Sequence, residues 1–65
     1  MKLTQREKDV CKCLIEGMSN PEIASRLYIS RHTVKSYLSQ IMANAKVKNR
    51  VQLAYILGKN NIIDV

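Results

Sequence analysis

The chain has 65 residues and a formal net charge of +6, with 11 Lys and Arg against 5 Asp and Glu. A domain of this size buries only about 60% of the surface that its unfolded chain exposes, which excludes a large buried cofactor or small-molecule ligand. No apolar run approaches the roughly 18 residues of a membrane span and no signal-peptide pattern opens the chain, so we expect a soluble, cytoplasmic protein.

The first predicted helix covers residues 5–16. Thr4 and Glu7 have the spacing of a capping box, in which each side chain bonds the free backbone N–H of the other residue. Gly17 is expected to end the helix, because glycine takes the left-handed conformation without a side-chain penalty. The side chains expected on or beside its inward stripe are Val10, Leu14, Cys11, Cys13 and Ile15.

Cys11 and Cys13 are the two cysteines of the chain. Two positions apart on a helix, their side chains point roughly 200° apart, so they cannot share a disulfide or a metal ion. We therefore expect reduced core residues of a cytosolic protein and no metal site.

Two further helices follow closely, over residues 21–27 and 31–44. Ser19 and Glu22 repeat the capping-box spacing, and Ser30 is a third N-cap residue. A short helix, a three-residue turn and a longer helix after a supporting helix describe a helix-turn-helix. In such motifs the second helix enters the major groove of DNA.

A fourth helix is expected over residues 50–57, with Asn49 as its cap and Gly58 and the Asn60–Asn61 pair at its end. Its sequence is apolar nearly all round, whereas a helix on a small core needs only one apolar stripe. Another copy of the same helix is the simplest cover for the second face, with Val51 and Tyr55 as interface candidates. The predicted fold is thus an all-α, compact four-helix domain that spans residues 1–65.

The charge is unevenly distributed, because residues 23–63 contain no Asp or Glu. The basic residues of this stretch are Arg26, Arg31, Lys35, Lys46, Lys48, Arg50 and Lys59. A positive face of this kind indicates a polyanion-binding protein. On the helix over residues 31–44, the apolar residues lie on one side and short polar or basic residues on the other, which favours DNA.

The residue pattern resembles the LuxR-type DNA-binding domain, also called FixJ/NarL or GerE-type, over about residues 3–57. The motifs that carry the resemblance are Leu3, Thr4, Arg6, Glu7, Val10, Leu14 and Gly17; Ser19, Asn20, Glu22, Ile23 and Ala24; Leu27, Ile29 and Ser30; Thr33, Val34 and Lys35; and Val47, Lys48, Asn49, Arg50 and Gln52. The resemblance implies a bacterial-type transcription regulator that acts as a dimer on double-stranded DNA. It also implies the output domain of a response regulator of a two-component system or of an autoinducer receptor, or a stand-alone regulator, with RNA polymerase as a candidate partner.

The resemblance also implies roles for individual residues. Lys35, Ser36 and Ser39 correspond to the main base-reading positions, and Gln40 has the chemistry to read adenine. The positions that correspond to phosphate contacts are Asn20, Thr33, Lys48 and Arg50. Arg31 and His32 join them because a helix N-terminus favours phosphate. For Arg50, a salt bridge to Glu7 or Glu22 is an alternative role.

This chain departs from the family pattern at the end of the third helix. Asn44, Ala45 and Lys46 stand where members usually have Lys, Leu and Gly, and Tyr37 stands where they usually have His. Without the glycine, we expect a penalty of up to about 1 kcal/mol unless Asn44 takes the left-handed position.

Other function classes fit the sequence less well. A protein-interaction module that docks a partner on the fourth helix is the main alternative, and RNA binding is weaker because no aromatic platform is present. An enzyme is not expected: the acids of the first helix are solvated, there is no Gly-rich phosphate loop, and His32 lacks a catalytic partner.

Overall fold

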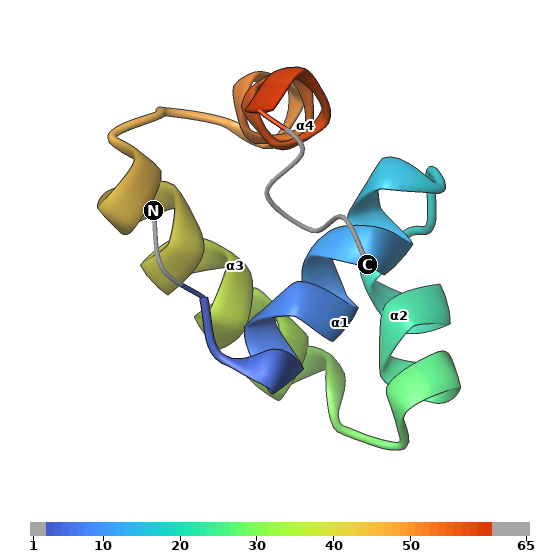
Figure 1. Ribbon diagram of the computed structural model, residues 1–65. Helices are drawn as coiled ribbons and strands as arrows, with labels where there is room; N and C mark the ends of the chain where they lie inside the picture. Colours follow the sequence, from blue (N-terminus) through green and yellow to red (C-terminus); the bar gives the residue numbers. More distant parts are fainter. Residues whose placement is uncertain (1–2, 61–65) are drawn as a thin grey trace.

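The computed structural model describes residues 3–60, which form four helices. They are α1 (Gln5–Ile15), α2 (Asn20–Leu27), α3 (Arg31–Ala45) and α4 (Arg50–Asn60). α1 packs against all three other helices, α2 and α3 pack against each other, and α4 lies across one end of the bundle (Figure 1). The described residues contain no strand, so the prediction of an all-α fold with a helix-turn-helix is confirmed.

The capping residues lie at the helix starts as predicted, although α2 begins at Asn20, one residue before the predicted start. The Thr4 N–H donates to Glu7 Oε1 at 2.8 Å and the Glu7 N–H to Thr4 Oγ1 at 3.2 Å. Ser19 and Glu22 form the same reciprocal pair at 2.8 and 3.4 Å. At α4, Asn49 Oδ1 accepts the Gln52 N–H at 2.9 Å. These local bonds satisfy backbone donors that a helix leaves free at its start.

Three left-handed residues end the first three helices. Gly17 has a φ of 86°, and the N–H groups of Gly17 and Met18 bond the carbonyls of Leu14 and Cys13, which is a Schellman motif. Tyr28 and Lys46 have φ values of 58° and 59° without being glycine. The predicted stop at Gly17 is confirmed.

The expected end of α3 at Asn44 is corrected by one residue. Asn44 and Ala45 are helical, and Lys46 takes the left-handed position that the family pattern gives to glycine. The Lys46 and Val47 N–H groups bond the carbonyls of Ala43 and Met42, so the hydrogen bonds of the cap form without the glycine. The side-chain penalty of the left-handed conformation therefore falls on Lys46.

Replacing Lys46 by Gly should raise the free energy of unfolding by about 1 kcal/mol, because the glycine removes a Cβ clash in the left-handed conformation. Urea unfolding followed by circular dichroism measures this change. Ala43→Gly is the matched control: Ala43 is exposed and helical, so the same new residue should lower stability by about 1 kcal/mol there. A loss of stability from both substitutions would contradict the strain at Lys46.

The predicted end of α4 at residue 57 is wrong. The helix continues through Gly58 to Asn60, while Asn61 lies outside the described residues. A glycine inside a helix costs only about 1 kcal/mol and therefore does not by itself end it. Leu53 and Leu57, both fully buried, hold α4 on the core up to this point.

The core consists of one buried apolar cluster that all four helices share. Its largest fully buried side chains are Ile23, Ile41, Leu53, Leu57, Val10, Val34 and Cys11. Ile15 is an exception to the predicted inward stripe, because 41% of it is exposed: it is the last residue of α1, at the edge of the cluster. Among residues 3–60, no helix is both long and apolar enough to cross a membrane.

Candidate nucleic-acid interface

The four predicted base-reading residues lie together on the outer face of α3. Lys35, Ser36, Ser39 and Gln40 are all exposed. Residues three or four positions apart are neighbours on a helix surface, so these side chains form one continuous strip over two turns. The opposite side of α3 is held in the core by Val34, Leu38 and Ile41, which orients the strip outward.

The side chains of this strip have no polar partner in the part of the chain that the structure describes. Within residues 3–60, none of them takes part in a side-chain hydrogen bond or an ion pair. Other cationic side chains are engaged: Arg6 and Arg26 form ion pairs with Asp9 and Glu16. The ammonium group of Lys35 and the hydroxyl and amide groups of its neighbours are therefore available to an external ligand.

The N-terminus of α3 adds donors beside this strip. Ser30 Oγ accepts the Thr33 N–H at 3.0 Å and lies 2.9 Å from Thr33 Oγ1, so the cap fixes the first turn. Arg31 and His32 are exposed in that turn, which contains no acidic residue. Their backbone N–H groups have no intrahelical acceptor, and the helix dipole favours an anion at this end. This end of α3 can therefore bind a phosphate.

The other predicted phosphate-binding residues lie on a different part of the molecule, where the starts of α2 and α4 meet. The Arg50 guanidinium donates to Asn20 Oδ1 through Nη1 and to the Met18 carbonyl through Nη2. Lys48 is exposed two residues before α4. The predicted phosphate-binding residues therefore lie on two surfaces, and Asn20 and Arg50 are hydrogen-bonded to each other.

The alternative salt bridge of Arg50 to Glu7 or Glu22 is not formed. Both carboxylates accept backbone N–H groups in their own capping boxes, at Thr4 and Ser19. The Ser19 backbone N–H, and after it the Ser19 hydroxyl, hold the pKa of the Glu22 carboxyl below its usual range. The local caps thus occupy the acids that Arg50 would need.

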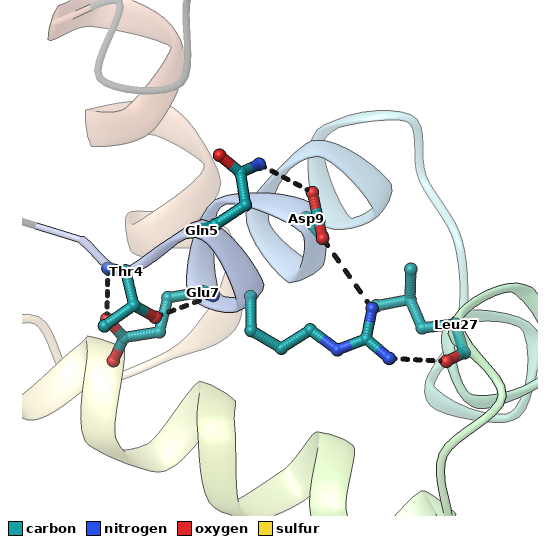
Figure 2. A network of polar contacts seen from close by, with 6 residues as sticks. Thr4, Gln5, Glu7, Asp9 and Leu27 are labelled. Carbon is teal, nitrogen blue, oxygen red and sulfur yellow. Dashed lines mark hydrogen bonds and ion pairs between the residues drawn. The ribbon is translucent and has the colours of Figure 1, made fainter.

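Arg6 has a structural role that the sequence did not indicate, because it appears there only among the residues that carry the family resemblance. Its Nη2 donates to the Leu27 carbonyl at 2.7 Å, and its Nη1 lies 3.7 Å from Asp9 Oδ2. Figure 2 shows these contacts beside the Thr4–Glu7 capping box. Leu27 is the last residue of α2, so Arg6 satisfies a free carbonyl at the turn that leads into α3. Because the two residues are 21 positions apart, no local pattern indicates the contact.

The exposed side of α4 carries an apolar groove. Val51 and Tyr55 are 79% and 67% exposed, although both side chains are large and apolar in character. They line an open groove of about 560 Å³ together with Lys46, Val47, Gln52 and Ile56. The predicted second apolar face of α4 is therefore present, and no other part of residues 3–60 packs on it.

Residues 3–60 contain no group of three or more His, Cys, Asp or Glu side chains that could hold a metal ion. Cys11 and Cys13 are buried and unpaired, as the core interpretation predicts. Burial, and after it the charge of Glu7, raise the pKa of the Cys11 thiol to about 11. Burial also raises the pKa of Cys13. These shifts are opposite to the lowered pKa that a reactive cysteine needs.

Comparison with known proteins agrees with the geometry of α2 and α3. The family model described as bacterial regulatory proteins, luxR family, matches residues 1–57. The chain is 45% identical over 60 residues to the uncharacterized transcriptional regulatory protein YhcZ of Bacillus subtilis, covering 92% of this chain and 28% of that protein.

Two further relatives are regulators as well. The transcriptional regulatory protein DesR of Bacillus subtilis is 42% identical over 50 residues, with 77% of this chain and 25% of DesR covered. The response regulator protein VraR of Staphylococcus aureus is 36% identical over 61 residues, with 94% of this chain and 29% of VraR covered. The chain thus spans less than a third of the length of these relatives.

Proposed function

The chain belongs to the luxR family of bacterial regulatory proteins, and from this premise we propose that it binds specific double-stranded DNA sequences and regulates transcription. One observation carries the proposal: α3 presents an exposed strip of Lys, Ser and Gln side chains that no other part of residues 3–60 engages. A helix held this way by the core has the dimensions to enter the major groove of B-DNA.

In the proposed complex, the residues that contact the bases are Lys35, Ser36, Ser39 and Gln40. The Lys35 ammonium can donate to guanine O6 and N7, and the Gln40 amide can form a bidentate hydrogen bond with adenine N6 and N7. Ser36 and Ser39 are short, so the backbone of α3 can approach the bases closely, and their hydroxyls bond bases directly or through water. The absence of acids from α3 removes repulsion as the helix enters the groove.

Phosphate binding falls to two groups of residues. The first group is the first turn of α3, with Arg31, His32 and Thr33. The second group lies at or just before the starts of α2 and α4, with Asn20, Lys48 and Arg50. Contacts to phosphates fix the register of a protein on DNA without reading sequence. In this arrangement they hold α3 in one orientation, and the strip on α3 then selects the bases.

The active unit is a homodimer that pairs α4 with the α4 of a second copy. Val51, Tyr55 and the groove beside them supply an apolar patch that a two-fold axis can bring against itself. The two copies then place their α3 helices on two half-sites of one DNA molecule.

Residues 1–65 form one DNA-binding domain, either alone or as the output part of a cytoplasmic response regulator. The similarity to the response regulator protein VraR supports the second arrangement. Bound near a promoter, such a regulator would act on RNA polymerase without catalysing a reaction itself or using a cofactor.

Selection of bound duplexes from a random DNA library tests the division of roles. Lys35→Ala and Ser36→Ala should each change the preferred base at one position, since one base contact contributes about 1–3 kcal/mol of discrimination. Lys48→Ala should weaken binding to all sequences by a similar factor and lower the log–log salt slope by about 1. Uniform losses from all three substitutions would reject base reading by α3.

A further inference from the structure

Arg50 forms a connection between segments that are far apart in the sequence. It is the first residue of α4, and its guanidinium reaches Met18 in the turn between α1 and α2 and Asn20 at the start of α2. These partners lie 32 and 30 positions earlier in the chain. Both bonds are partly buried, and hydrogen bonds to a charged group are about twice as strong as neutral ones.

The Arg50 bonds add to the apolar packing that holds α4 on the core. Leu53 and Leu57 are its two fully buried side chains, one turn apart on a single stripe. A polar bond at the first residue of the helix adds a further fixed point, which opposes rolling or sliding of α4 on this stripe. α4 packs on α1 and α3, so the Arg50 bonds form its direct polar tie to the start of α2.

The same bond sets the orientation of the Asn20 side chain. Asn20 Oδ1 accepts from Arg50, so the Nδ2 group of the amide is the end that remains to donate outward. Arg50, the first residue of α4, is thereby bonded to Asn20, the first residue of the helix-turn-helix.

We propose that Arg50 is a positioning residue that fixes the angle between α4 and the helix-turn-helix, and thereby selects the spacing between the two half-sites that the dimer accepts. The proposal rests on the function proposed above, because it takes α4 as the dimer contact and α3 as the reading helix. Val51 and Tyr55 follow Arg50 on the same helix, so a roll of α4 displaces the second copy and its α3 together.

DNA geometry makes spacing a sensitive readout of this angle. One added base pair moves the second half-site by about 3.4 Å and rotates it by about 35° around the DNA axis. A rigid dimer rejects such a shift, whereas a dimer with a loosened α4 tolerates it. A residue that only contacts phosphate, or only stabilises the fold, would change affinity without changing the preferred spacing.

Binding of the chain to duplexes with one half-site, and with two half-sites at several spacings, tests the proposal. Arg50→Lys keeps the charge and cannot bridge Asn20 and Met18 in the fork geometry of a guanidinium. It should reduce the affinity ratio between the best spacing and spacings one base pair longer or shorter by about tenfold. Because Arg50 is also one of the proposed phosphate contacts, any loss of that contact should lower the affinity for single and paired duplexes by the same factor and leave the spacing ratio unchanged.

Two further variants complete the experiment. Asn20→Ala removes one of the two acceptors, leaves Arg50 in place and should reduce the ratio in the same direction, which keeps the test valid if Arg50→Lys does not fold. Lys48→Ala removes a neighbouring cation but leaves the connection intact, so it should weaken all duplexes by one factor. A wild-type spacing ratio in folded Arg50→Lys and Asn20→Ala would overturn the proposal.

Failure of the proposed function gives a different result. If the wild-type chain shows no preference for paired over single half-sites, the dimer on DNA is rejected and the positioning role with it. If the wild-type chain has a sharp spacing preference and Arg50→Lys lowers the affinity for every duplex equally, only the positioning role is rejected.

Discussion

Replacing Ile23 by Ala should reduce the free energy of unfolding by about 3 kcal/mol, because the substitution deletes buried carbon atoms and leaves a cavity. Ile23 is fully buried and belongs to the short helix α2. A domain of this length has a total stability of about 3–10 kcal/mol, so the loss removes between a third and all of it. Urea unfolding followed by far-UV circular dichroism should show a much lower midpoint or no folded baseline.

Ile15→Ala is the matched control for this prediction. It deletes the same atoms from a helical isoleucine that is 41% exposed, and should therefore lower stability by less than about 1 kcal/mol. Equal losses at the two positions would contradict the distribution of the core. DNA binding by Ile23→Ala should fall in proportion to the folded fraction, because Ile23 and Val34 both belong to the core cluster that holds α2 and α3.

The helix starts could be predicted from the sequence because capping is local. Thr4 with Glu7 and Ser19 with Glu22 are three residues apart, and each pair closes its hydrogen bonds without help from the rest of the fold. The outward face of α3 could also be predicted from the sequence, because helical periodicity alone places Val34, Leu38 and Ile41 on its inward side. The exposure of Lys35, Ser36, Ser39 and Gln40 follows from that periodicity, whereas their proposed base-reading roles rest on the family resemblance and on side-chain chemistry.

The helix ends and the polar connections depend on tertiary structure. Lys46 adopts the left-handed conformation although its Cβ disfavours that conformation. α4 continues past Gly58 because Leu53 and Leu57 hold the helix on the core. Arg50 bonds Asn20 and Met18, rather than an acid, because the capping boxes already occupy Glu7 and Glu22. Competition of this kind between distant groups leaves no periodic pattern in the sequence.

Replacing Tyr55 by Glu should abolish the preference for paired half-sites, with a loss of about 100-fold in affinity for the paired duplex and a small loss for a single half-site. In a two-fold interface each substitution occurs twice, so two carboxylates would enter one apolar patch beside Val51 and the groove. Burial of like charges without partners is unfavourable. Titrations of both duplexes, with sedimentation of the complexes, measure the effect.

The ratio between the two duplexes separates dimerisation from the added negative charge, because repulsion between the new carboxylate and DNA acts on both duplexes. Tyr28→Glu makes the same chemical change at a tyrosine that is 94% exposed and lies outside the groove, so it should leave the ratio at the wild-type value. A wild-type ratio in Tyr55→Glu would reject α4 as the dimer contact. The exposed groove would then favour the protein-interaction alternative, in which α4 docks a different protein while α3 still binds DNA.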